Sequence, residues 1–202
     1  MKIFKRAVSI FLALALLFAL AACGNDGSGA ALSYPIESQP ECLDPQIAQG
    51  AEAKTVVLNC FEGLVRKDSE GKFSPAAAKS WSYDSASLTY TFKLREDARW
   101  VIMKKAYKSI LGDDIDNTFD SRVTAADFVF ALKRAVNPAT GAPEAMSLGV
   151  IKNAKSIING KLSPDKLGVS AVGDFGLRIT LEHATDEAAF LDLLTKAECM
   201  PC

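Results

Sequence analysis

The 202-residue sequence has few of the residues on which catalysis or nucleic-acid binding depends. It holds a single histidine, His183, and no serine in the strand-to-helix motif that presents a hydrolase nucleophile. Its 23 basic and 24 acidic residues leave a net charge of −1, so nothing in its charge points to nucleic acid as a partner. It contains no internal repeat. These absences weigh against a hydrolase, a nucleic-acid-binding protein and a repeat protein.

Long hydrophobic runs are scarce too, and the one at the N-terminus is too short to cross a membrane. Residues 7–22 are almost wholly apolar and follow a basic start, "MKIFKR". The run has about 16 residues, whereas a bilayer core needs roughly 20. A basic start, a short apolar run and small residues at its end predict a secretory signal peptide over residues 1–22.

The signal segment ends at a cysteine whose setting predicts lipid attachment. "LAAC" (20–23) resembles a bacterial lipobox, the pattern that is cut before a cysteine whose sulfur takes a diacylglycerol. Two or more acyl chains hold a protein durably at a membrane. We therefore expect Cys23 to be lipidated, residues 23–31 to form a flexible tether, and the protein to be exported and anchored at the outer face of the cell membrane or in the periplasm.

The remaining cysteines leave alternatives open. Cys42, Cys60, Cys199 and Cys202 can pair in three ways, and an exported compartment permits disulfides. Cys199 and Cys202 also form a CxxC motif, which favours redox chemistry or metal binding when it opens a helix. Here the motif follows a predicted helix instead of opening one. The other interpretation is structural: these cysteines either belong to a cysteine pair or are reduced thiols in the core.

Residues 32–202 are predicted to form one mixed α/β or α+β domain. Alternation predicts half-buried strands at 88–94 and 177–181, and "LSYPIES" (32–38) predicts a third. A helix over 124–136 is predicted with Thr124 and Asp127 as a capping box, and its stripe contains Phe128, Ala131, Leu132 and Ala135. Further helices are predicted at 51–61, with Val56, Val57, Cys60 and Phe61 buried, and from about Thr185. Gly63 is predicted to be a left-handed helix cap, and Trp81 and Trp100 to be core anchors.

Five segments in order resemble one protein family. They are "CLDPQIAQG", "NCFEGLVRKDSEGKFSPAAAKSW", "LTYTFKLREDARW", "VTAADFVFALKRAVNPATGAP" and "LGVSAVGDFGLRITL". Together they resemble the bacterial extracellular solute-binding proteins of family 5, the oligopeptide and dipeptide receptors of ABC importers. The resemblance implies a two-lobed, periplasmic-binding-protein-like (type II) fold. This chain would be a truncated, N-terminal portion of it, because the family usually runs near 500 residues.

The resemblance also implies a ligand site. The loop after Asp44-Pro45 would line the cleft, which assigns ligand contact to Ile47, Ala48, Gln49, Gly50 and Ala51. Gln49 stands where an oligopeptide receptor has an acidic residue, so a salt bridge to a peptide amine is not expected there. Glu144 stands where that receptor has a tyrosine; it is either a replacement charge or a solvated carboxylate at a helix start.

The chain also differs from the family between Trp100 and Val123, where it has a long segment and the family has a short Gly-containing turn. Its "DDIDNTFD" carboxylates suit either a solvated acidic loop or a Ca²⁺ site, although the closing glutamate of an EF-hand is missing.

The function that the resemblance implies is that of a non-enzymatic, monomeric substrate-binding component. It would bind peptides without a cofactor or metal site and deliver them to the membrane permease of an ABC importer. Relatives that take nickel, haem or sugars keep other ligands open, and an exported thiol redox or metal-binding lipoprotein using Cys199 and Cys202 is the alternative.

Overall fold

The computed structural model describes residues 33–101 and 120–202. Residues 37–202 form one compact unit, and residues 33–36 belong to a separate one. The helices are α2 (Ala51–Cys60), α5 (Ala125–Val136), α6 (Ala154–Ile158) and α7 (Glu187–Leu193). The strands are β1 (Val65–Lys67), β2 (Phe73–Pro75), β3 (Ala78–Asp84), β4 (Thr89–Leu94), β5 (Val169–Val172) and β6 (Gly176–Thr180). Four short 3₁₀ turns complete the described elements: η1 (Pro138–Thr140), η2 (Ala145–Val150), η3 (Pro164–Lys166) and η4 (Ala197–Cys199).

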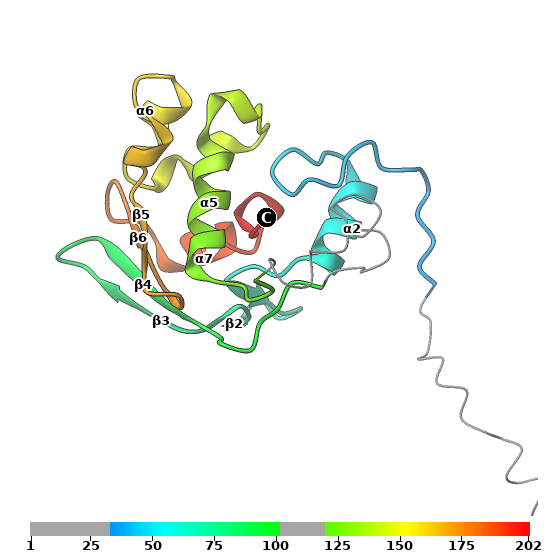
Figure 1. Ribbon diagram of the computed structural model, residues 1–202, viewed down its shortest axis with the longest axis horizontal. Helices are drawn as coiled ribbons and strands as arrows, with labels where there is room; N and C mark the ends of the chain where they lie inside the picture. The colour runs from blue at the N-terminus through cyan, green and yellow to red at the C-terminus, as the bar shows by residue number, and fades with distance from the viewer. Residues whose placement is uncertain (1–32, 102–119) are drawn as a thin grey trace, which may run out of the picture. The chain divides into compact units, whose positions relative to one another are not determined.

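A four-stranded antiparallel sheet in the order β3-β4-β6-β5 forms the centre of the unit (Figure 1). The two alternating segments predicted from the sequence lie next to each other, with Tyr90 opposite Ile179 and Phe92 opposite Leu177. All four of these side chains are fully buried. The predicted inward faces of both strands are therefore confirmed, although Leu88 precedes β4 and is only half-buried. β1 and β2 form a separate hairpin.

Helices α5 and α7 pack on the buried face of this sheet. The predicted stripe of α5 is fully buried, and the Phe190 ring of α7 lies 4.6 Å from the Tyr90 ring. The Asp127 half of the predicted capping box is present, because the Thr124 amide donates to Asp127 Oδ2 at 2.6 Å. Asp186 accepts from the Ala189 amide at 2.9 Å at the start of α7, which confirms a helix from this region.

The predicted burial of α2 is wrong in part. Val57 is buried as expected, but Ala53 is the other buried residue of the helix, and Cys60 is exposed. The reason is that α2 packs on residues near the C-terminus, Ala197 and Met200, and these contacts select a different face of the helix.

The prediction that Gly63 is a left-handed cap is also wrong. Gly63 is absent from the residues with positive φ, and α2 ends in extended backbone at Phe61. Gly63 is required for a different reason: a Cβ atom there would lie 2.8 Å from the carbonyl oxygen of Leu194. The glycine therefore lets the chain entering β1 approach the end of α7 closely.

Two further predictions need correction. Residues 33–38 contain no strand, since no described segment pairs with them. Trp81 packs against the main core but is only half-buried, and Trp100 is half-buried beside Phe61 with the rings at 74°. Neither tryptophan is a fully buried anchor. The "DDIDNTFD" segment lies outside the described residues except for Asp120.

Candidate functional site

The loop that the resemblance assigns to the ligand is built on a turn that starts at Asp44. The Ile47 and Ala48 amides donate to the Asp44 carbonyl oxygen at 3.1 and 2.8 Å. Ala48 is buried and anchors the loop, while Gln49, Gly50 and Ala51 are exposed. The last three residues, at the start of α2, are thus the ones open to a ligand.

A partly buried ion pair fixes this turn to α5. The Arg134 guanidinium donates through Nη1 to Asp44 Oδ1 at 2.8 Å and through Nη2 to Asp44 Oδ2 at 2.5 Å. The same Nη1 donates to Gln46 Oε1 at 2.5 Å. We call Asp44, Gln46 and Arg134 the arginine clamp. A two-pronged pair of this kind constrains orientation as well as distance, so the loop is held in one position relative to α5.

The clamp also favours the charged forms of its members. The hydrogen bonds from Arg134 lower the pKa of Asp44, and the Gln46 amide, which donates to Asp44 Oδ1 at 3.0 Å, acts in the same direction. Asp44 in turn raises the pKa of Arg134. The pair is therefore ionised at neutral pH.

Residues 197–202, here called the C-terminal segment, support the loop from the other side. Gln46 Nε2 donates to the Met200 carbonyl oxygen at 3.1 Å. Ala197 and Met200 pack in a small apolar cluster with Ala48 and with Val57 of α2. Figure 1 shows the C-terminal end of the chain between α5 and α2. The loop, the clamp and the C-terminal segment therefore form one packed unit.

Glu144, the second predicted ligand residue, makes no described side-chain hydrogen bond or ion pair with this unit. It is exposed at the start of η2, and no described hydrogen bond or ion pair engages its carboxylate. An indirect connection exists through its neighbour, because Ser147 Oγ donates to Glu144 O at 2.7 Å and contacts buried Glu198 of the C-terminal segment at 3.4 Å. The structure thus leaves the Glu144 carboxylate exposed, with no described hydrogen bond or ion pair to the 47–51 loop.

Sequence reasoning missed a cavity of about 670 Å³ next to the end of α2. Phe61 and Trp100 line it, with Arg99 and two cysteines, Cys60 and Cys202. None of the predicted ligand residues is among those that line it. The sequence signal for this cavity was a pair of aromatic residues, Phe61 just after α2 and Trp100 after β4. Both were predicted to be buried in the core.

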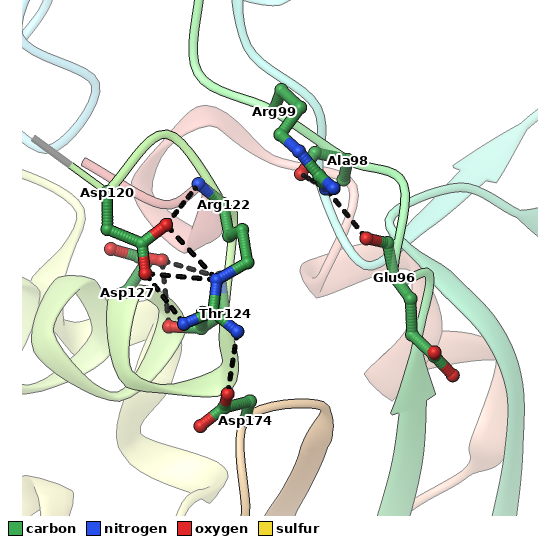
Figure 2. A network of polar contacts seen from close by, with 8 residues as sticks. All are labelled: Glu96, Ala98, Arg99, Asp120, Arg122, Thr124, Asp127 and Asp174. Carbon is green, nitrogen blue, oxygen red and sulfur yellow. Dashed lines mark hydrogen bonds and ion pairs between the residues drawn. The ribbon is translucent and has the colours of Figure 1, made fainter. Parts of the chain in front are cut away.

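Beside this cavity, polar contacts flank the segment between Trp100 and Val123. Arg99 donates to the carbonyl oxygens of Glu96 and Ala98 before the segment, and Arg122 contacts Asp120 at its end (Figure 2). The Trp100 amide donates to Ser121 O at 2.7 Å, and the Val123 amide donates to Ala98 O at 3.1 Å. Arg122 donates to Asp120 Oδ2 at 2.7 Å, which lowers the pKa of Asp120 to about 2. We call this arrangement the neck.

Arg122 also connects the neck to the sheet. Its Nη1 donates to Asp174 Oδ2 at 2.9 Å, in the turn between β5 and β6. The carbonyl oxygen of Asp174 accepts from the Ala125 amide at 2.7 Å, at the first turn of α5. The β5–β6 turn therefore contacts both Arg122, as Figure 2 shows, and the first turn of α5.

The CxxC motif is poorly suited to thiol chemistry. Cys199 is 1% exposed, and burial raises its pKa well above the ordinary value. A buried thiol with a raised pKa supplies little of the thiolate that is the reactive form. Cys42, Cys60, Cys199 and Cys202 are all unpaired in the structure.

The described part of the chain offers neither a metal-binding cluster nor a membrane-spanning helix. Across residues 33–101 and 120–202, no group of three or more histidine, cysteine and acidic side chains is arranged to hold a metal ion. No helix within those two ranges has the length and apolar character to cross a membrane.

The sequence matches a family of known proteins. Residues 72–201 match "Bacterial extracellular solute-binding proteins, family 5 Middle". The periplasmic oligopeptide-binding protein OppA of Haemophilus influenzae is 41% identical over 140 residues, which are 68% of this chain and 23% of that protein. A dipeptide-binding protein of Lactococcus lactis is 34% identical over 173 residues, 85% of this chain and 28% of that protein.

Solved structures agree with the sequence matches. The Escherichia coli murein tripeptide binding protein MppA superposes with a TM-score of 0.67 at 34% identity, covering 82% of this chain and 29% of that one. The Haemophilus influenzae OppA complex with the peptide RPPGFSPFR gives 0.65 at 36% identity, covering 81% and 29%. The chain spans about a quarter of the length of the relatives it matches. With more than half of its residues matched to the family and a shared fold, the chain belongs to the bacterial extracellular solute-binding proteins of family 5.

Proposed function

We propose that this chain forms part of the peptide-binding receptor of an ABC importer. The observation that carries the proposal is the similarity to relatives named for binding oligopeptides, dipeptides or a murein tripeptide, at 34–41% identity. Such a receptor performs no chemical step: it encloses its ligand by hinge motion and passes it to membrane permease subunits.

Within this function, the 47–51 loop is the ligand-contacting element of the chain. The arginine clamp holds the loop on α5, while Gln49, Gly50 and Ala51 stay exposed. A binding element has to be exposed yet fixed, because a mobile loop would lose conformational entropy on binding. Gln49 offers amide donors and acceptors, and Glu144 supplies a negative charge for a peptide amine.

A titration of the ¹⁵N-labelled chain followed by NMR tests this assignment. The probe is the nonapeptide RPPGFSPFR, and a neutral disaccharide serves as the comparison. We expect the peptide to shift the Gln49 and Gly50 amide resonances and the disaccharide to leave them unchanged. A Gln49→Ala, Glu144→Gln double variant should weaken the response. Shifts confined to the residues around Trp100, or equal responses to both probes, would show that the loop is not a peptide contact.

We also propose that the protein is exported and anchored through lipid on Cys23. The support is the N-terminal sequence, with its signal-like residues 1–22 and lipobox-like end, together with relatives named as periplasmic. Residues 23–31 act as a tether and residues 32–202 as the folded region. The folded region works as a monomer with peptide and permease as partners.

Mass spectrometry of the membrane fraction tests the anchor. Cells expressing the full chain should yield an N-terminal peptide that begins at Cys23 and carries acyl mass. Cys23→Ala protein should appear in the soluble fraction or remain uncleaved. If that variant stays bound to the membrane as firmly as the parent after cleavage, the cysteine is not the anchor.

A further inference from the structure

Two exposed cysteines line the same cavity, although they lie 142 positions apart in the sequence. Cys60 is the last residue of α2, and Cys202 ends the C-terminal segment. Both line the cavity of about 670 Å³, next to Phe61 and Pro201. Nothing in the proposed peptide-binding function uses either thiol.

The packing around this cavity joins the two elements that carry the cysteines. Val57 lies one helical turn before Cys60 on α2, and it packs in the apolar cluster that also contains Met200. Cys60 itself is exposed, off the buried face of α2, and borders the cavity at the end of the helix. Pro201 and Cys202 follow Met200 directly and also line the cavity, and Cys60 is the one other cysteine among the residues that line it.

We propose that Cys60 and Cys202 form a disulfide bond that ties the end of α2 to the C-terminal segment. The bond would secure the two elements that support the 47–51 loop, in addition to the arginine clamp. The proposal goes beyond the peptide-binding function and does not depend on it, because it concerns two thiols that contact no predicted ligand residue.

The oxidant is a low-molecular-weight disulfide such as oxidised glutathione. The exposed Cys60 thiol loses its proton and its sulfur attacks one glutathione sulfur, which forms a mixed disulfide and releases one glutathione thiolate. The Cys202 sulfur then loses its proton, attacks the Cys60 sulfur and releases the second thiolate. Partial burial raises the pKa of Cys202, whereas the neighbouring Arg134 charge acts in the opposite direction. In balance, two protein thiols are oxidised and oxidised glutathione becomes two molecules of glutathione.

The test is disulfide mapping of the full chain. The purified protein is reduced, exchanged into oxidised glutathione at neutral pH, digested without reduction and analysed by mass spectrometry. We expect a linked pair of peptides that contain Cys60 and Cys202, and a melting temperature that rises by roughly 5 °C or more relative to the reduced protein.

Two matched variants distinguish a Cys60–Cys202 disulfide from the other possible cysteine pairs. Cys60→Ser should abolish the internal link and the rise in melting temperature, while its reduced form melts with the reduced parent because the side chain is exposed. Cys42→Ser should keep both. A link from Cys202 to Cys42 or Cys199, or only glutathione adducts on Cys60 and Cys202, would overturn the proposal. A disulfide requires Cα atoms about 4.4–6.8 Å apart, so failure to form would also show that the two elements do not approach closely enough.

Discussion

At the scale of single residues, the Tyr90 hydroxyl is a buried polar group that the described fold leaves unsatisfied. Tyr90 is fully buried between Tyr83 and Phe190, and its hydroxyl has no hydrogen-bond partner in the part of the chain that the structure describes. A buried donor without a partner costs free energy that an apolar side chain of the same shape does not. Burial also raises the pKa of Tyr90 to about 12.

Tyr90→Phe should therefore stabilise the protein by about 1 kcal/mol at neutral pH. The parent should also lose stability that the variant keeps as the pH rises. The folded pKa lies above the unfolded value of about 10, so the folded state holds the proton longer, and the loss begins near pH 10 and is complete near pH 12. Urea unfolding at pH 7 and pH 11 measures both effects. Exposed Tyr34→Phe is the control and should change neither value.

The arginine clamp leads to a prediction with the opposite pH dependence. Arg134→Met should lower stability by about 1–3 kcal/mol at pH 7, because it leaves a partly buried carboxylate without its charged partner. The folded pKa of Asp44 is depressed, so this contribution is present above the unfolded pKa and is lost as the pH falls through the folded value. Parent and variant should thus converge only once the pH has fallen below the folded pKa of Asp44, which lies beneath the ordinary aspartate value.

Lys133→Met provides the matched control on the same helix. Its partner Asp165 is 80% exposed, and exposed pairs contribute about 0–1 kcal/mol. Hydrogen exchange supplies a second measurement, since only the Arg134 variant should speed exchange of the Ile47 and Ala48 amides. Equal effects from both variants would show that the clamp holds nothing in place.

At the scale of elements, the neck joins the two stretches of chain that flank residues 102–119. The hydrogen bonds between Trp100 and Ser121 and between Val123 and Ala98 already bring the ends of this segment together. Replacing residues 102–119 by a short Gly-containing turn should therefore leave the melting temperature within about 3 °C of the parent, because loop length changes closure entropy only slowly. Thermal unfolding followed by circular dichroism measures this. A loss of cooperative unfolding would show that the segment is part of the core.

Sequence patterns predicted the elements in which buried residues recur at a regular spacing along the chain. The alternation of β4 and β6, the stripe of α5 and its Thr124–Asp127 cap were all recognisable, because local periodicity and capping determine them. The buried face of α2 was assigned wrongly, because it depends on Met200, more than 140 positions away. The role of Gly63 was predicted wrongly for the same reason, because the contact that requires a glycine there is with Leu194, which is distant in the sequence.

For the candidate site, the sequence supplied only an expected location, which stays a prediction. Resemblance pointed to residues 47–51, and the structure shows three of them exposed on a firmly held turn. The clamp was not predicted, because Asp44 and Arg134 carry no pattern that relates them across 90 positions. The cavity beside Trp100 was missed because a tryptophan near a strand end has the same sequence signature whether it fills a core or lines a hollow.

At the scale of the whole molecule, a single core joins the sheet to its helices. Phe92 occupies the middle of β4, is fully buried and belongs to the cluster that includes Phe128 and Phe190. Phe92→Ala should cost about 3–5 kcal/mol, as cavity-forming substitutions in cores do. Denaturant unfolding measures the loss, and exposed Lys93→Ala should cost much less. A cost below about 1 kcal/mol for Phe92→Ala would mean that this core is not continuous.

The strand order has a consequence for how the chain folds. β3 and β4 are close in sequence and can form a hairpin early, but the other neighbour of β4 is β6, which begins only at Gly176. Contacts between distant segments form slowly because a long loop must close first. During synthesis or translocation β4 therefore remains an open sheet edge, with a row of unpaired amides and carbonyls, until more than 80 further residues have emerged. Such edges invite pairing with other chains. The interval before β6 arrives therefore leaves β4 open to such pairing, a consequence of the strand order alone.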